Sequence, residues 1–226
     1  LWNLSGEGNY GIGELLMTKL RIYDQVTAHR VDEFIAGSEN AKKRIKKIYG
    51  VDSKVVYPFV DLGRFKDAES WDGGYFLVIS RLNKYKRVDL AVEACLKLGI
   101  SLKVVGSGPE QDSLGIGNLS DEMVVEVLSG CRALIIPGIE DFGIPSLDAQ
   151  ALGKPVISYG EGGALETVVD GKTGLFFNDP TVESLMKVLE RFDPSKFDKN
   201  ACISNTKKFS KEKFIPNFEQ TVASLV

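Results

Sequence analysis

The sequence has only one histidine, His29, among its 226 residues. A serine or cysteine nucleophile needs a nearby base for activation, and histidine is a common choice for that base. His29 lies in the polar run QVTAHRVDEF, with no serine or cysteine motif beside it. We therefore assign His29 a solvated or structural role, and the sequence argues against a histidine-activated nucleophile.

Cysteine is scarce as well, and long apolar runs are absent. Cys95, Cys131 and Cys202 lie too far apart to form a metal-binding motif, and such spacing is typical of a reducing compartment. No apolar run is long enough to span a bilayer. The opening LWNL resembles neither a signal peptide nor a native start, so we expect a chain cut from something longer. These absences predict a cytoplasmic protein, with the inner face of the membrane as an open alternative.

Positive charge is not in excess. The net charge is −3 and the pI is about 5.4, whereas a dedicated nucleic-acid binder is normally basic, so we expect no nucleic-acid partner. The exception is a predicted helix at 39–49, capped by Ser38 and ended by Gly50, with a run of cations at Lys42, Lys43, Arg44, Lys46 and Lys47. That helix face is either simply solvated or a peripheral contact for anionic lipid or phosphate.

Strands and helices alternate regularly along the chain. We expect a glycine-rich loop at 1–18, and strands at 31–36, 54–57, 75–80, 101–105, 133–136, 155–159 and 173–177. We expect helices at 16–29, 39–49, 88–98, 121–130, 181–191, 194–206 and 210–225, the last kinked or broken at Pro216. The alternation over 75–192 predicts an α/β fold with a doubly wound, mainly parallel, Rossmann-like sheet.

Residues 132–169 hold two strand–loop–helix units, and the first gathers polar groups after its strand. Glu140 lies in the loop, and Asp148 is expected in the first turn of the following helix. In an open α/β sheet, ligands bind at the carboxyl ends of the strands. A helix start at Phe142-Gly143-Ile144-Pro145 would leave backbone N–H groups free for a phosphate. The alternative is that the carboxylates only complement the helix dipole.

The second unit repeats the pattern. The pair Gly162-Gly163 follows the strand, and Glu166 opens another helix. A tight turn with an acidic residue at a helix start accounts for these residues without any ligand. Because their strand is predicted to be parallel to the preceding one, we nevertheless expect them at the same edge of the sheet as Glu140.

Two other loops carry groups that suit a phosphate. Arg81 and Lys86 flank a turn directly after the strand at 75–80, and two cations there can neutralise a diphosphate. Gly106 and Gly108 follow the next strand and would let the backbone approach a ligand closely. A solvated basic loop explains the two cations equally well, and an ordinary turn explains the two glycines. A binding site is favoured only because all these loops are predicted to lie at one edge of the sheet.

These residues resemble a known family. The stretches ISRLNKYKRVDLAVEA and EDFGIPSLDAQALGKPVISYGEGGALETVVDGKTGLFF look like the donor half of retaining GT-B glycosyltransferases of glycosyltransferase family 4. The bacterial and archaeal mannosyltransferases of surface-polysaccharide synthesis are the most similar subgroup, and RVDEFIAGSENAKKRIKKIYG and VVYPFVD match it as well. The resemblance covers roughly residues 20–192, and its most specific part is the pair of carboxylates around FGIP.

The resemblance implies roles at the reacting centre. Glu140 would be the catalytic carboxylate beside the transferred sugar, which it would hold while stabilising an oxocarbenium-like transition state. Arg81 and Lys86 would bind the donor diphosphate and offset the charge that grows on it as it leaves. The backbone at Gly143 and Ile144 would complete the phosphate seat. The family needs no metal and no separate cofactor, and the leaving phosphate is usually taken to accept the acceptor's proton.

The resemblance also implies a nucleotide pocket. Asp148 would accept hydrogen bonds from the ribose, although the family usually has the longer glutamate at this position. Gly106 and Gly108 would lie near the nucleotide, and the loop at Gly117 to Leu119 would border the base. The segment between Glu110 and Ser120 looks about nine residues shorter than the family pattern, so we expect a strand and part of the base pocket to be absent or altered.

The chain holds only part of the two-domain fold that the resemblance implies. Residues 1–50 would be the helical tail of a mostly missing N-terminal acceptor domain, and residues 51–209 the nucleotide-sugar binding domain. Residues 210–226 would form a helix that crosses back to the missing domain. A separate chain would then be a possible source of the acceptor-binding half.

Three functions compete at this point. The first is retaining transfer of a hexose, with GDP-mannose as the preferred donor and UDP-sugars open, to a glycan or lipid-linked acceptor. The second is a non-catalytic module of the same fold that binds a nucleotide or a partner subunit without turnover. The third, a nicotinamide-linked oxidoreductase, is disfavoured because no GxGxxG follows the first strand of a βαβ unit.

Overall fold

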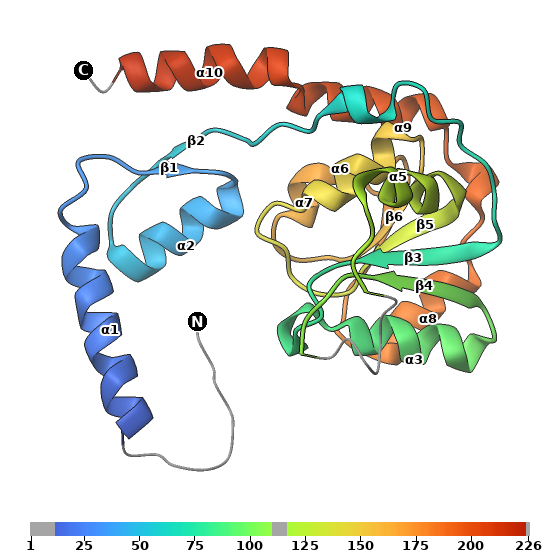
Figure 1. Ribbon diagram of the computed structural model, residues 1–226, viewed down its shortest axis with the longest axis horizontal. Coiled ribbons are helices and arrows are strands. Elements are labelled where there is room, and N and C mark those ends of the chain that lie inside the picture. The colour runs from blue at the N-terminus through green and yellow to red at the C-terminus, as the bar shows by residue number, and fades with distance from the viewer. Residues whose placement is uncertain (1–11, 110–116, 225–226) are drawn as a thin grey trace.

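The computed structural model describes residues 12–109 and 117–224, and within them a five-stranded sheet forms the centre. The sheet order is β4-β3-β5-β6-β7, and every neighbouring pair is parallel. The strands are β3 (Tyr75–Ile79), β4 (Ser101–Val105), β5 (Cys131–Ile136), β6 (Val156–Tyr159) and β7 (Gly174–Phe177). Figure 1 shows this arrangement, which confirms the predicted parallel α/β sheet of Rossmann type.

Helices cover both faces of the sheet, which explains why the strands are almost wholly apolar. On one face lie α3 (Val88–Leu98) and α8 (Val182–Glu190), which pack against each other. On the other face lie α5 (Asp121–Gly130), α6 (Ile144–Ala151) and α9 (Lys199–Thr206). The fold is therefore doubly wound, as predicted.

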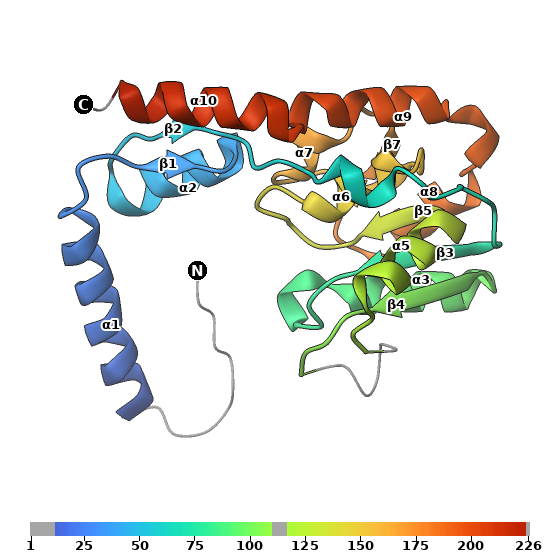
Figure 2. The same ribbon diagram turned by 45° about the horizontal axis from the view of Figure 1, so that its top comes forward.

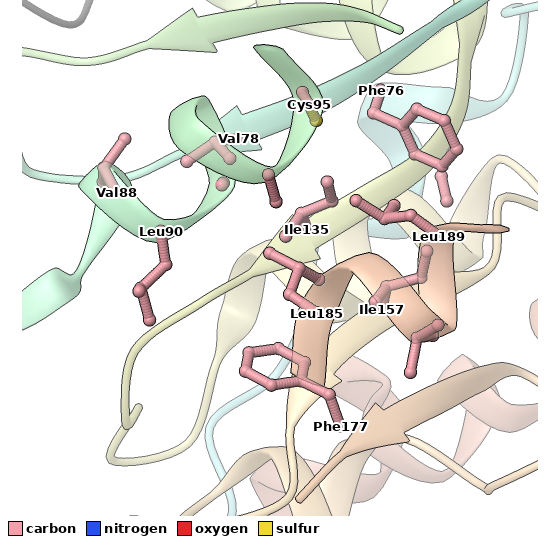
Figure 3. Packing of buried hydrophobic residues seen from close by; sticks show 14 of the residues in the cluster. Phe76, Val78, Val88, Leu90, Cys95, Ile135, Ile157, Phe177, Leu185 and Leu189 are labelled. Atoms are coloured by element: carbon pink, nitrogen blue, oxygen red, sulfur yellow. The ribbon is translucent and has the colours of Figure 1, made fainter. Parts of the chain in front are cut away.

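The core between the sheet and the α3–α8 layer is built from branched and aromatic side chains. Figure 3 shows strand residues facing helix residues there, among them Val78, Ile135, Ile157, Leu185 and Leu189. Full burial of one such side chain contributes about 2 kcal/mol. This core fixes the strands, and through them the loops that leave their carboxyl ends.

The strand order reverses beside β3, and this places the candidate loops next to each other. From β3 the chain moves outward to β4 at the sheet edge, then returns to place β5 on the other side of β3. Such a reversal is a topological switch point, where the loops diverge and leave a crevice. Those loops are residues 80–87 after β3 and residues 137–143 after β5.

The N-terminal part forms a small separate element of helices and strands. It comprises α1 (Ile12–Ala28), β1 (Ile35–Ala36), α2 (Glu39–Tyr49) and β2 (Lys54–Val55), with β1 and β2 paired in parallel. Helix α2 has the predicted bounds, because Ser38 caps its start and Gly50, at φ 73°, ends it. The predicted loop at 1–18 is wrong from Ile12 onward, since α1 begins there, and residues 1–11 lie outside the described part.

Helix α10 (Lys211–Ala223) runs from the sheet domain back over the N-terminal part (Figure 2). Lys54 Nζ donates to Ser224 Oγ at 2.8 Å, so the end of the helix contacts β2. Of the two outcomes expected at Pro216, a kink or a break, the break is wrong, because α10 is continuous across this residue. The helix loses one internal N–H donor at this proline and continues on either side.

The predicted helix at 194–206 is two elements. A short 3-10 helix, η3 (Pro194–Lys196), is followed by α9, which begins at Lys199. Asp198 explains the interruption, because its carboxylate accepts the N–H of Asn200 and so caps a new helix start. The described residues also form four short helices: η1 (Leu62–Phe65), η2 (Lys84–Lys86), α7 (Ala164–Thr167) and η4 (Lys207–Phe209).

Candidate functional site

Lys86 and Glu140 meet at the switch point. Lys86 ends the 3-10 helix η2 (Lys84–Lys86) after β3, and Glu140 lies in the loop after β5. Lys86 Nζ lies 2.7 Å from Glu140 Oε1, and the two side chains are only 14% and 19% exposed. A half-buried pair of this kind is screened little by water, so its charges act strongly on a ligand nearby.

Close backbone packing fixes both loops. A Cβ on Gly138 would lie 2.6 Å from the carbonyl oxygen of Lys86, so only glycine lets the β5 exit pass this close to η2. Arg87 ends η2 with φ 53°, an uncommon value for a residue with a side chain. The carbonyl of Glu140 in turn accepts the N–H of Gly163 at 2.7 Å. The charged pair is therefore held by backbone contacts on two sides.

Helix α6 starts immediately beyond Glu140. Gly143 is its N-cap with φ 92°, which favours glycine, and Pro145 lies in the first turn as predicted. The Ser146 hydroxyl donates to the carbonyl of Gly143 at 2.7 Å and fixes this start. Ile144 is exposed, so the helix end can be reached from solvent. Such an end can accept an anion.

Asp148 does not lie in the first turn of α6, contrary to expectation. The helix begins at Ile144, so Asp148 is one turn further along. Its carboxylate lies 3.9 Å from Arg64 Nη1 of η1, and its side chain is 14% exposed. Burial raises the pKa of Asp148 to about 6, although the charge of Arg64 opposes the shift. No signal in the sequence indicated that Arg64 would lie beside Asp148.

This raised pKa predicts a pH-dependent effect of Asp148→Asn. Below pH ~4 the acid is protonated in both states and asparagine replaces it without penalty. As the pH rises from about 4 to about 6, Asp148 ionises in the unfolded chain but stays protonated in the folded one, so the stability of the wild type falls relative to the variant; above about 6 both states are ionised and the difference is constant. Between pH ~4 and pH ~6, the free energy of unfolding of the variant should rise by on the order of 3 kcal/mol relative to that of the wild type.

Urea denaturation of wild type and Asp148→Asn between pH 4 and pH 8 measures this gain. Asp179→Asn is the matched control, because Asp179 is exposed. A difference between Asp148→Asn and wild type that stays constant with pH would contradict the prediction.

The glycines after β4 approach the chain's own backbone. A Cβ on Gly106 would lie 1.8 Å from the carbonyl oxygen of Ser80, and one on Gly108 2.4 Å from that of Leu82. Gly106 also bridges to Gly117, its N–H donating to that carbonyl at 3.0 Å. The close approach therefore joins the exits of β3 and β4, and a role toward a nucleotide stays a prediction for Gly106 and Gly108.

The loop before α5 lies partly outside the described residues. Gly117 is buried with φ 86°, and Leu119 packs against the core under α5 and α6. The expected shortening between Glu110 and Ser120 falls largely on residues 110–116, of which the structure describes nothing. The role of Gly117 and Leu119 beside a base thus stays a prediction.

Arg81 is exposed at the start of the loop after β3, and within residues 12–109 and 117–224 it has no ion pair. The same described residues hold no group of three metal-ligating side chains. No helix among them is both long and apolar enough to cross a membrane. Lys86 and Arg81 supply two cations, Glu140 one acid, and the start of α6 free N–H groups. This combination suits a ligand in which an anion is attached to a group that becomes electropositive.

A hollow adjoins Glu140 on the side of α2. Its volume is about 310 Å³, and it lies between α2 and the residues that follow Glu140, namely Asp141 and Phe142. Most of its lining is apolar, with Ile45, Ile48 and Tyr49 from α2 and Pro58 opposite. A second molecule in this hollow would contact Asp141, the residue directly after Glu140.

Comparison with known sequences identifies similar proteins. Residues 63–209 match the family described as glycosyl transferases group 1. The chain is 36% identical over 124 residues to an alpha-1,3/1,6-mannosyltransferase of Dictyostelium discoideum, covering 52% of this chain and 29% of that protein. It is 26% identical over 190 residues to an uncharacterized glycosyltransferase of Methanocaldococcus jannaschii, covering 77% and 51%. The chain thus spans about half, or less, of these relatives.

Solved structures share the fold. A sucrose-phosphate synthase from Thermosynechococcus elongatus superposes with a TM-score of 0.78 at 18% identity, over 92% of this chain and 62% of that one. The Anabaena protein HepE, in complex with UDP and glucose, superposes with a TM-score of 0.76 at 17% identity, over 90% and 66%. At such identities the likeness shows the fold alone.

Proposed function

We propose that this chain, which belongs to the glycosyl transferases group 1 family, is the donor half of a retaining glycosyltransferase. It would transfer a hexose from a nucleoside diphosphate sugar to a glycan or lipid-linked acceptor. The observation that carries the proposal is the Lys86–Glu140 pair, 2.7 Å apart at the switch point of the sheet. A cation for the diphosphate and an acid for the sugar are what the reaction requires side by side.

The residues divide this work by charge. Lys86 and Arg81 would hold the diphosphate and stabilise it as the sugar departs, and the start of α6 at Gly143 and Ile144 would add N–H donors. Glu140 would lie against the anomeric carbon and stabilise its developing positive charge. No metal is needed in this scheme. One such charge contributes roughly 3 kcal/mol, or about a hundredfold in rate.

We assign mannose as the sugar and GDP-mannose as the donor. Support comes from the sequence resemblance to mannosyltransferases and from the 36% identity to the Dictyostelium mannosyltransferase. The HepE structure contains UDP and glucose, which makes UDP-glucose the alternative to test. Asp148 would receive the ribose with either base.

The acceptor-binding half would lie over α1 and α2. The matched relatives are about twice as long as the aligned part or more, so the group 1 enzymes contain more than the donor half. Helix α1 exposes an apolar face through Leu15, Leu20, Tyr23 and Val26, and a partner domain, whether in the same polypeptide or another, would cover it. The hollow beside Asp141 would then receive the acceptor, in the cytoplasm or at the inner membrane face.

Isothermal titration of the chain with GDP, UDP, GDP-mannose and UDP-glucose tests the donor assignment. We expect one nucleoside diphosphate to bind and its sugar conjugate to bind more tightly, because Glu140 adds contacts to the sugar. Arg81→Gln should weaken binding about tenfold through loss of one exposed cation, whereas Lys196→Gln, far along the chain and exposed, should not change it. Absence of binding by all four nucleotides contradicts the proposal.

The non-catalytic alternative is decided by turnover. The chain is combined with the acceptor-binding half of a group 1 relative, and sugar transfer is measured with the nucleotide sugar that binds best. Transfer eliminates the alternative. Tight nucleotide binding with no transfer, under conditions where the relative's own donor half restores activity, supports it.

A further inference from the structure

The loop that carries Glu140 is held from two directions. On one side, the N–H of Gly163 donates to the carbonyl of Glu140 at 2.7 Å. On the other side, α2 contributes: Asn40 Nδ2 lies 3.4 Å from the same carbonyl, and the Ser38 hydroxyl donates to the carbonyl of Asp141 at 2.6 Å. The backbone position of Glu140 therefore depends on where α2 lies, a hundred residues earlier in the chain.

An ion pair adds to this contact. Arg44 of α2 pairs with the carboxylate of Asp141. Both side chains are more than half exposed, so the pair alone contributes little stability. The pair instead orients the loop relative to α2, because it joins the second turn of α2 to the residue directly after Glu140.

Glu166 fixes the start of α2. One carboxylate oxygen accepts the N–H of Glu39 at 2.8 Å, and the other accepts the N–H of Asn40 at 3.0 Å. These are two of the four N–H groups that a helix leaves without an internal partner, and a negative charge there is favoured by the helix dipole. Burial, together with the neighbouring Glu166, raises the pKa of Tyr57 to about 12, so its hydroxyl stays a donor toward Glu166.

The residue next to Glu166, Thr167, belongs to a buried hydrogen-bond network. Helix α7 has only four residues, but Thr167 is fully buried. Thr167 Oγ1 lies 2.7 Å from Ser146 Oγ, and the Thr167 carbonyl accepts Gln150 Nε2 and Asn205 Nδ2, each at 2.9 Å. Ser146 and Gln150 belong to α6, the helix that begins at the proposed phosphate seat. A satisfied buried network of this kind holds its members in one arrangement.

We propose that Glu166 is a positioning residue, which uses α2 to set the Glu140 loop against the donor sugar. The inference rests on the proposed function, because it assigns Glu140 to the sugar. Glu166 touches neither the sugar nor the diphosphate in this scheme. Removing it should therefore impair recognition of the sugar and leave affinity for the nucleoside diphosphate unchanged.

The first test needs no nucleotide. Hydrogen exchange is measured on the full chain for wild type, Glu166→Ala, Glu166→Gln and Glu161→Ala, the last replacing an exposed glutamate of the same loop. We expect the amides of Glu39 and Asn40 to exchange at least about tenfold faster in Glu166→Ala, because they lose their acceptor. Glu166→Gln, which keeps one carbonyl acceptor, should lie between, and Glu161→Ala should match wild type. Unchanged exchange in Glu166→Ala overturns the inference.

The second test separates positioning from a merely structural role. The ratio of the Kd for the nucleoside diphosphate to the Kd for its sugar conjugate measures how well the sugar is held. We expect Glu166→Ala and Arg44→Met, which act from opposite sides of the contact, both to lower this ratio several-fold at constant diphosphate affinity. Equal losses of both affinities, or an unchanged ratio, overturn the inference. Absence of nucleotide binding by wild type overturns the proposed function instead, while the exchange result still stands.

Discussion

Lys86→Met is expected to weaken the binding of a nucleoside diphosphate about a hundredfold, equivalent to ~3 kcal/mol. Methionine is unbranched and only one atom shorter than lysine, so it keeps most of the packing and removes the charge. The loss is large because Lys86 is 14% exposed, so water cannot replace its interaction with an anion. It is larger still because Glu140 would remain, unpaired and negative, beside the incoming diphosphate.

The control lies on the same short helix. Lys84→Met removes an exposed lysine two positions earlier in η2 and should leave the Kd within about threefold of wild type, as expected for a solvated charge. Glu140→Gln should bind the diphosphate as well as wild type or better, since it removes the competing anion, yet gain little from the attached sugar. Titration calorimetry gives all three results. Equal affinity in wild type and Lys86→Met would place the diphosphate elsewhere.

Gly163→Ala is expected to destabilise the protein strongly, although the change adds only one methyl group. The backbone of Gly163 is helical, at φ −67° and ψ −17°, so alanine causes no strain by itself. The added Cβ, however, would lie 2.4 Å from the carbonyl oxygen of Asp141 and from Cα of Phe142. Both are backbone atoms that cannot rotate away, so we expect a loss of about 3 kcal/mol and a fall in Tm of roughly 10 °C.

Gly171→Ala provides the comparison. Gly171 has φ 69° and open space around its Cα, so alanine there meets only the strain of a left-handed backbone, about 1 kcal/mol. Thermal unfolding of the two variants, with wild type beside them, tests the assignment. If Gly163→Ala were no less stable than Gly171→Ala, the prediction would be contradicted, because the backbone at 140–143 would have moved to make room for the added Cβ.

The sheet could be read from the sequence because its signals are local. An apolar strand such as 75–79 between polar turns has one stable environment, a parallel sheet covered on both faces. Helix α2 was predicted to the residue because Ser38 and Gly50 mark its ends. The helix at 194–206 was wrong because the capping residue Asp198 competes with continuation, and helical spacing alone does not reveal that competition.

The site was predictable only in part. Glu140 and Lys86 follow adjacent strands, so strand order alone brings their loops together. The contacts of Asp148 with Arg64 and of Glu166 with α2 were not foreseen. Both join segments that are far apart along the chain, and neither periodicity nor spacing records which side chains meet across such a distance. For Glu166 the sequence offered either the dipole of its own helix or a place at the shared sheet edge, whereas its carboxylate accepts two N–H groups at the start of α2.

The position of β3 also has a consequence for biosynthesis. Its first neighbour, β4, is complete by residue 105, but its second neighbour begins only at Cys131. A nascent chain leaving the ribosome at about 5 to 20 residues per second therefore carries one unpaired apolar edge for seconds. Parallel strands cannot pair through a short hairpin, because the crossover segment between them must be synthesised first. The same arrangement that creates the crevice beside β3 thus leaves this strand the most open to aggregation before synthesis passes β5.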